Sequence, residues 1–267
     1  METNKICRVG IDIGSTTLKI IVLNLLDEII YKVYRRHKAD FNNILVDELS
    51  KLLLIYPDSV FRVSVTGSAG MGLSEHIDIP FIQEVVASIH VLKKEFPDTC
   101  TLIDIGGEDA KMVFFEKGKQ PDIRMNGSCA GGTGAFIDQM ADLMNISVEE
   151  LAKQAGEYDQ LYPVASRCGV FAKTDVQNLI SRNIPIADIS ISILHTVALQ
   201  CITTLARGCD IKPKIICTGG PLTFIPALRR SFVELLEIEE SDLILPENSE
   251  YFPAWGAALN NNDEQPA

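Results

Sequence analysis

Apolar residues form two stretches that each predict a β-hairpin. The first reads VGIDIGSTTLKIIVL over residues 9–23, and the second reads TLIDIGGEDAKMVFF over residues 101–115. In each stretch an apolar run ends in an aspartate, which is followed by one isoleucine and a glycine-containing turn. A second apolar run then follows the turn. The two stretches match at Asp12 and Asp104, Gly14 and Gly106, and Lys19 and Lys111. This repeat predicts two similar domains that face one another.

The rest of the chain alternates between helical and strand patterns. Apolar residues at helical spacing predict helices over residues 40–55, 80–96, 133–144, 170–180 and 186–207. Short apolar runs next to glycine predict strands over residues 62–66 and 214–217. Such alternation is typical of an α/β fold whose sheets are covered by helices on both faces. We expect one domain over residues 1–98, a second over 99–252, and a C-terminal helix with a polar tail over 253–267.

Composition narrows the class of protein. The 267 residues are 46% hydrophobic and 22% charged, which is typical of a globular chain. A net charge of −12 argues against nucleic acid as a partner, because such binding relies on basic patches. The apolar runs are much shorter than the ~20 residues that span a bilayer, and the first residues contain no apolar signal segment. Seven scattered cysteines favour a reducing, cytoplasmic compartment over a disulfide scaffold.

The turn of the first hairpin is a candidate phosphate-binding loop. Its small and hydroxylated residues would let backbone amides approach an anion and would add hydroxyl donors; they are Gly14, Ser15, Thr16 and Thr17. Lys19 on the outgoing strand is expected to neutralise a phosphate. Asp12, at the end of the incoming strand, is expected to hold Mg²⁺, which prefers oxygen ligands. The alternative is an ordinary hairpin with a solvated turn.

The second turn supplies matching residues for the other side of a nucleotide cleft. Asp104 is expected to act as a second Mg²⁺ ligand and in catalysis, and Gly106, Gly107 and Asp109 to contact the nucleotide. Glu108 is a candidate for orienting an attacking water, as phosphoryl transfer requires. Glu84 is a second candidate for that role. The alternative for these acidic side chains is solvated surface charge.

A later glycine pair follows the strand predicted near residue 217. Gly219, Gly220 and Pro221 would let the backbone pack against a flat ligand such as adenine and its ribose. On its own this signal is more typical of a plain turn, and it gains weight beside the two phosphate-binding hairpins.

Two cysteines stand before glycines that open predicted helices. Cys129 precedes the run from Gly131 to Gly134, and Cys168 precedes Gly169. A helix N-terminus stabilises a thiolate, so this pair could ligate a metal. An iron–sulfur cluster usually needs four thiolates, which two copies of the chain would supply. From spacing alone, a buried or incidental pair of thiols is the favoured interpretation. The other cysteines are expected to pack in the core: Cys7, Cys100, Cys201, Cys209 and Cys217.

Several segments together resemble the 2-hydroxyacyl-CoA dehydratase activators of the BadF/BadG/BcrA/BcrD-type ATPase family. They are VGIDIGSTTLKIIVL, LIDIGGEDAKMV, MNGSCAGGTGAFIDQMA, SRCGVFAKTDV and TGGPL. The resemblance extends over nearly the whole chain. The two cysteine motifs are specific to that family within the wider actin–hexokinase–Hsp70 superfamily.

The resemblance implies two ribonuclease-H-like domains, of the actin-like ATPase type, around a cleft that binds Mg²⁺ and ATP or ADP. It also implies one 4Fe-4S cluster per homodimer, held by Cys129 and Cys168 of each copy. ATP-driven domain rotation would reach the cluster through the helices that begin near Thr133 and Gly169. The cluster would take an electron from ferredoxin or flavodoxin and pass it at low potential to a dehydratase or reductase component. Such chemistry is expected in anaerobes.

Some positions depart from the commoner activators, which carry alanine at Gly131, arginine at Ala135 and often glutamine at Glu108. The sequence around both cysteines more closely resembles a branch of the family in which the activator is one domain of a very long polypeptide. Two other functions keep the phosphate motifs but need no cysteine pair. One is a small-molecule kinase of the N-acetylhexosamine kinase type, and the other is a non-catalytic nucleotide-binding scaffold.

Overall fold

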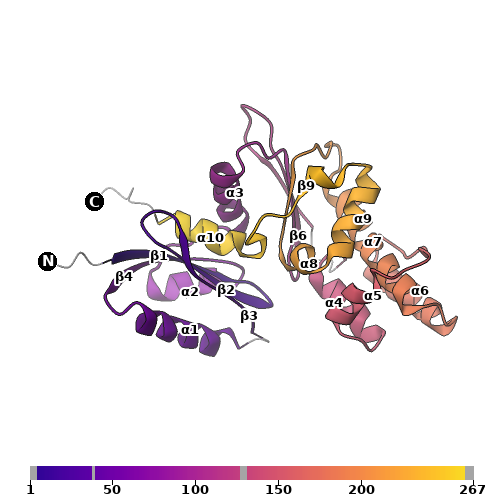
Figure 1. Cartoon of the computed structure of the whole chain (residues 1–267), viewed down its shortest axis with the longest axis horizontal. Helices are drawn as coiled ribbons and strands as arrows, with labels where there is room; N and C mark the ends of the chain where they lie inside the picture. Colours follow the sequence, from indigo (N-terminus) through magenta and orange to yellow (C-terminus); the bar gives the residue numbers. More distant parts are fainter. Residues whose placement is uncertain (1–4, 38–39, 127–130, 262–267) are drawn as a thin grey trace. The chain divides into compact units, whose positions relative to one another are not determined.

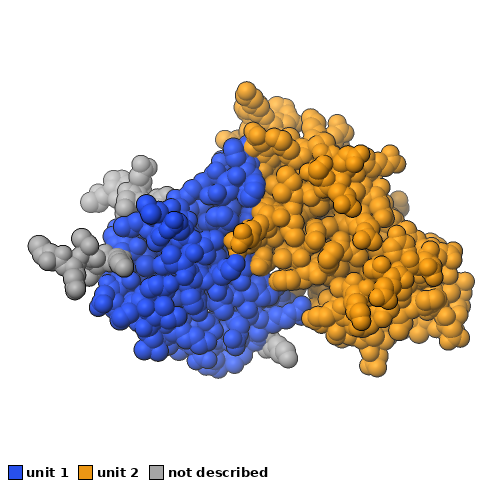
Figure 2. Space-filling model, viewed as in Figure 1, with its two compact units in different colours: residues 1–97, 251–267 blue, residues 98–250 orange. Residues whose placement is uncertain are grey.

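The computed structural model describes residues 5–37, 40–126 and 131–261. The chain divides into two compact units (Figures 1 and 2). Unit 1 contains residues 1–97 and 251–267, and unit 2 contains residues 98–250. The chain therefore leaves the first unit once and returns to it at its C-terminal end.

Unit 1 is built on a four-stranded sheet with the order β3-β2-β1-β4. The strands are β1 (Lys5–Ile13), β2 (Thr17–Leu23), β3 (Ile29–Arg36) and β4 (Ser59–Thr66). Strands β1, β2 and β3 pair antiparallel as a meander, and β4 pairs parallel to β1. The inner strands β1 and β2 are buried along almost their whole length, which explains why both read as near-continuous apolar runs.

The helices of unit 1 are α1 (Phe41–Ile55), α2 (Gly70–Ile77), α3 (Glu84–Glu95) and α10 (Phe252–Leu259). Helix α10 packs directly against β1 and α3 (Figure 1). A Cβ added to Gly10 of β1 would lie 1.8 Å from the Ala254 carbonyl oxygen. A Cβ added to Gly256 would lie 1.9 Å from the Ala87 carbonyl oxygen of α3. Glycine at these two positions is what lets the backbones meet.

Unit 2 repeats the same strand plan with one strand more. Its sheet has the order β7-β6-β5-β8-β9. The strands are β5 (Thr101–Ile105), β6 (Ala110–Phe114), β7 (Asp122–Met125), β8 (Ile215–Thr218) and β9 (Leu243–Ile244). Strands β5, β6 and β7 form an antiparallel meander, and β8 runs parallel to β5. The α/β class and the repeat predicted from the two hairpins are thus confirmed.

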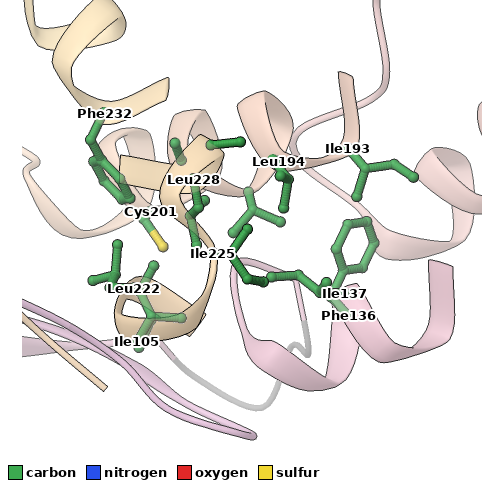
Figure 3. Packing of buried hydrophobic residues seen from close by; sticks show 14 of the residues in the cluster. Ile105, Phe136, Ile137, Ile193, Leu194, Cys201, Leu222, Ile225, Leu228 and Phe232 are labelled. Atoms are coloured by element: carbon green, nitrogen blue, oxygen red, sulfur yellow. The ribbon is translucent and has the colours of Figure 1, made fainter. Parts of the chain in front are cut away.

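The longer connections of unit 2 are helical. They are α4 (Gly134–Leu143), α5 (Val148–Gln154), α6 (Gly169–Ser181), α7 (Ile186–Leu205), α8 (Gly220–Phe224) and α9 (Pro226–Leu236), with 3₁₀ turns at Glu240–Asp242 and Ser249–Tyr251. The core lies between the sheet and these helices. Figure 3 shows side chains from β5, α4, α7, α8 and α9 meeting there, among them Ile105, Phe136, Leu194, Leu222 and Phe232.

Helix α7 is 20 residues long and has a mean hydropathy of 1.5, so its length and composition alone would allow it to cross a membrane. In the structure 67% of the apolar 18-residue segment of this helix is buried inside the protein. Ile189, Ile193 and Val197 belong to the core of unit 2. The apolar character of α7 is therefore explained by its position as a core helix.

The helix expected over residues 80–96 begins later than predicted, at Glu84. The residues before it are extended and pair alongside the end of β4. The Val65 amide donates to the Pro80 carbonyl at 2.9 Å, and the Ile82 amide donates to the Val65 carbonyl at 3.0 Å. This pairing with β4 outcompetes the helical pattern, because an exposed strand edge offers unpaired backbone groups.

The close crossing of α10 and α3 generates a prediction about stability. Gly256→Ala should lower the free energy of unfolding by about 1–3 kcal/mol, because the new methyl group meets the α3 backbone rather than a flexible side chain. Thermal and denaturant unfolding would measure the loss. Gly72→Ala in α2 is the matched control, since a Cβ there meets nothing within 4 Å. Equal stability of the two variants would contradict the described packing.

Candidate functional site

The first hairpin turn joins β1 to β2 and is closed by a hydrogen bond from the Gly14 amide to the Thr17 carbonyl, 3.0 Å long. Asp12 stands opposite Lys19 in the register of the two strands. Its carboxylate is completely buried, and the Lys19 Nζ atom donates to Asp12 Oδ2 at 2.8 Å. Burial alone would lower the pKa of Lys19, but the charge and hydrogen bond of Asp12 outweigh it and raise that pKa. In this structure Lys19, expected at a phosphate, is bound to Asp12.

The second turn repeats this arrangement in unit 2. The Gly106 amide donates to the Asp109 carbonyl at 2.8 Å, and Asp104 stands opposite Lys111. Lys111 is 2% exposed. Its Nζ atom lies 3.5 Å from Asp104 Oδ2 and 2.8 Å from Asp109 Oδ2. A buried ammonium is tolerated only where carboxylates compensate it, so these two aspartates hold Lys111 in place.

Both turns contain backbone amides without a recorded hydrogen-bond acceptor in the described structure. No acceptor is recorded, within the part of the chain that the structure describes, for the amides of Ser15 and Thr16 in the first turn or of Gly107 and Glu108 in the second. Ser15 and Glu108 are exposed. Unpaired amides in a turn form a concave donor surface that suits an anion.

The two aspartates differ in their remaining carboxylate oxygen. Asp104 Oδ1 accepts a hydrogen bond of 2.7 Å from the hydroxyl of Thr218, its neighbour on β8. Asp12 has the corresponding neighbour Thr66 on β4. Yet Asp12 Oδ1 and Thr66 Oγ1 are both buried without a partner among the described residues. A buried oxygen without a partner is costly, and Asp12 thus has an acceptor available to a cation or its water.

A glycine follows each of these threonines and lets the chain pass close to the aspartate. Gly67 and Gly219 both have φ near +90°, a conformation that favours glycine. A Cβ on Gly67 would lie 2.5 Å from Asp12 Oδ1, and a Cβ on Gly219 would lie 3.0 Å from Asp104 Oδ1. Sequence reasoning selected Gly219 and missed Gly67. The repeated Thr-Gly pair at the ends of β4 and β8 was the signal that could have found it.

The other predicted site residues are distributed between the units. Glu84 is the first residue of α3 in unit 1, close enough to Lys19 to add to the increase in its pKa. Glu108 lies at the tip of the second turn in unit 2. Gly220 and Pro221 begin α8, directly after β8. Unit 1 therefore brings together Asp12, Lys19 and Glu84, and unit 2 brings together the predicted residues near Asp104.

The second turn is fastened to the start of α4. The amides of Gly134 and Ala135 donate to the carbonyls of Gly106 and Gly107, at 2.9 and 2.6 Å. These first helical amides, expected to favour a thiolate, are thus used by the turn. Immediately before α4, Cys201 of α7 donates its S–H to the Gly132 carbonyl, with 3.2 Å between the heavy atoms.

Cys168 is the N-cap residue of α6 and is partly exposed. No polar partner of its sulfur is recorded in the described ranges. The segment before it is held by a row of polar side chains on α7. Asp188 accepts from the amides of Asp159 and Gln160, and Ser192 accepts from the amide of Tyr162 at 2.8 Å. Helix α7 therefore fixes the approach of the chain to Cys168.

The remaining cysteines divide into two groups. Cys7, Cys201 and Cys217 are buried as predicted, and burial raises the pKa of the last two to about 12. The core assignment is wrong for Cys100, which is partly exposed, whereas Cys209 is partly exposed but still packs against the core of unit 2. Arg124 donates to the Cys209 sulfur at 3.0 Å. Arg124 belongs to β7, so Cys209 combines a core contact with a polar partner that its apolar sequence context does not reveal.

Cys129, the other predicted cluster ligand, lies outside the described residues. Among the residues that the structure describes, no group of three or more His, Cys, Asp and Glu side chains could hold a metal ion. Cys168 alone could supply one thiolate ligand.

Known proteins resemble the chain over almost its whole length. It is 31% identical to the (R)-2-hydroxyglutaryl-CoA dehydratase activating ATPase of Acidaminococcus fermentans, over 94% of this chain and 95% of that protein. It is 28% identical to the 2-hydroxyisocaproyl-CoA dehydratase activator of Clostridioides difficile, over 96% of this chain and 94% of that protein.

A solved structure gives the same result at the level of the fold. The activator of the 2-hydroxyisocaproyl-CoA dehydratase from Clostridium difficile, with bound ADPNP, superposes with a TM-score of 0.84 at 29% identity. The match covers 97% of this chain and 95% of that chain. The family resemblance and the actin-like ATPase fold predicted from the motifs are confirmed. Matched by the family model over residues 9–260, the chain belongs to the BadF/BadG/BcrA/BcrD ATPase family.

Proposed function

We propose that the chain is an ATP-dependent activator that delivers a low-potential electron to a 2-hydroxyacyl-CoA dehydratase or a related CoA-substrate reductase. Relatives aligned over nearly the whole chain are named as activators of such dehydratases, and one of them as an activating ATPase. The observation that carries the nucleotide part is the buried, unpartnered Asp12 Oδ1 beside a turn whose Ser15 and Thr16 amides have no recorded acceptor among the described residues.

Asp12 is the residue we propose for Mg²⁺. Lys19 binds Oδ2, so Oδ1 is the oxygen available to the cation or to one of its waters. Asp104 was an equal candidate by sequence, but Thr218 and Lys111 already engage both of its oxygens. We therefore assign Asp104 to holding Lys111 and the second turn, and not to the cation.

The turn amides are proposed to bind phosphate oxygens, together with the hydroxyls of Thr16 and Thr17. Gly219, Gly220 and Pro221 are proposed for adenine and ribose, because the positive φ of Gly219 favours glycine and this surface therefore carries no side chain there. Glu108 is our candidate for orienting the attacking water. It is exposed at the tip of a turn that offers free amides in the described structure, whereas the charge of Glu84 already acts on Lys19.

Cys168 and Cys129 are proposed to hold a 4Fe-4S cluster between two copies of the chain. When bound, such a cluster supplies one-electron transfer at low potential. Cys168 suits the role because the residue is partly exposed and its sulfur has no recorded polar partner among the described side chains. The exposed Val170 and Phe171 beside it, at 72% and 66%, are apolar surface that a second copy would cover.

Contacts inside unit 2 would link the nucleotide turn to this thiol. The turn carbonyls hold the start of α4, and Phe136 of α4 packs under Gly169 at the start of α6. A nucleotide that favours one position of the turn would thereby favour one position of α6. Transfer would go from a ferredoxin or flavodoxin donor to the dehydratase or reductase component in a cytoplasmic, anaerobic setting.

The assignment of Mg²⁺ to Asp12 predicts unequal effects of two matched variants. Asp12→Asn should reduce Mg²⁺-dependent ATP hydrolysis by about 100-fold or more, because the cation loses its anionic ligand. Both variants should lower the thermal stability, because each weakens the support of a lysine withdrawn from water, but Asp104→Asn should retain Mg²⁺-ATP binding. Calorimetry and steady-state hydrolysis would measure both. Equal loss of Mg²⁺-ATP binding in the two variants would contradict the assignment.

The cluster assignment predicts that Cys168→Ser, prepared without oxygen, loses its iron but binds Mg²⁺-ATP as the wild type does. Cys209→Ser is the matched control, because that thiol is also partly exposed but is bound by Arg124. It should keep the iron of the wild type. Iron analysis with visible absorption would decide, and unchanged iron in Cys168→Ser would refute the ligand. Sugar-dependent ATP consumption would instead favour the kinase alternative.

A further inference from the structure

His37 lies behind the first turn and contacts it twice. The residue follows β3 directly and is 5% exposed. Its Nε2 atom lies 2.9 Å from the Gly14 carbonyl oxygen, and its backbone amide donates to the Thr16 carbonyl at 3.2 Å. A carbonyl oxygen only accepts, so Nε2 carries the proton of the first contact. Both contacts therefore hold carbonyl groups of the turn.

Holding a carbonyl also directs the amide in the same peptide unit. A trans peptide is planar, and its C=O and N–H groups point in opposite directions. The described chain contains no cis peptide bond, so the Ser15 N–H points away from the His37 ring. Ser15 is exposed, and its amide has no recorded acceptor in the described structure. The imidazole thus orients the Ser15 amide toward solvent.

Unit 2 achieves the same orientation by other means. There, the amides of Gly134 and Ala135 at the start of α4 donate to the carbonyls of Gly106 and Gly107. By the same geometry, the amides of Gly107 and Glu108 point away from α4. Backbone amides alone thus support the second turn, whereas a side chain and one backbone amide support the first. Of these supports, only the side chain can be removed by a single substitution.

We infer that His37 is a positioning residue for phosphate binding, which fixes the first turn so that the Ser15 amide is directed at a phosphate of the nucleotide. The inference rests on the proposed function, since it assigns the turn to the nucleotide. His37 does not contact the phosphate itself; it acts through the Gly14 carbonyl. A preorganised turn does not have to be ordered when the anion binds, and this saves free energy of binding.

Packing is the competing explanation for a buried histidine. The His37 ring meets the ring of Phe41 edge to face, with 6.0 Å between centroids. His37→Phe would keep an aromatic ring there and remove the donor, whereas His37→Gln would keep an N–H donor at similar reach. The two variants therefore separate packing from positioning. His76→Phe is the control, because His76 also contacts a carbonyl, that of Gly72 at 2.7 Å, but on the exposed helix α2.

The test measures the affinities of the full-length wild type and of each variant for Mg²⁺-ADP and for adenosine by titration calorimetry. His37→Phe should weaken Mg²⁺-ADP binding about fivefold to tenfold, the loss expected for one hydrogen bond, and leave adenosine binding unchanged. His37→Gln should remain within about twofold of the wild type, and His76→Phe should match it.

Three results would overturn the inference. Unchanged Mg²⁺-ADP affinity in His37→Phe would show that the contact does not position the turn. Equal losses for Mg²⁺-ADP and adenosine, or a loss in His37→Gln as large as in His37→Phe, would assign His37 to packing. A wild type that binds no Mg²⁺-ADP would overturn the proposed function and this inference together, whereas the first two results leave the function standing.

Discussion

Each unit places a lysine across a β-hairpin from an aspartate, with most of both side chains withdrawn from water. Burying either charge alone would cost several kcal/mol, so each hairpin is stable only while its pair is intact. The two pairs are Asp12 with Lys19 and Asp104 with Lys111. What differs is the threonine on the adjacent parallel strand, which binds Asp104 but leaves Asp12 Oδ1 without a recorded partner in the described structure. The repeated hairpin arrangement therefore contains one aspartate whose two carboxylate oxygens are both bound, Asp104, and one with an oxygen available to a cation, Asp12.

The hydrogen bonds that hold the two hairpin turns also provide the proposed link between nucleotide binding and electron transfer. In both units the turn carbonyls are held from behind, which turns the amides outward. In unit 2 the holding group is the start of α4, and α4 packs in turn against α6, whose N-cap is Cys168. A shift of the turn therefore cannot occur without a response at the start of α4. Helix α7, with its polar side chains facing the segment before Cys168, gives this part of unit 2 a fixed support.

Local patterns predicted the hairpins and most helices, because their periodicity and glycine turns are written in consecutive residues. Contacts between distant segments were harder to predict. The equivalence of Thr66-Gly67 with Thr218-Gly219 depends on which strands run parallel to β1 and β5. The pairing of Lys19 with Asp12 follows from the hairpin register. From sequence, however, a lysine beside a phosphate-binding loop is more readily assigned to the phosphate than to an aspartate. The late start of α3 also required a distant strand edge, that of β4.

The central claim is that one chain combines an ATP site with half of a cluster site. Iron and acid-labile sulfide per chain, measured without oxygen across the size-exclusion peak, test it most directly. The account predicts about two irons and two sulfides per chain in a dimer-sized peak, the half share of a four-iron cluster. Metal-free protein in a monomer-sized peak that still hydrolyses ATP would contradict it.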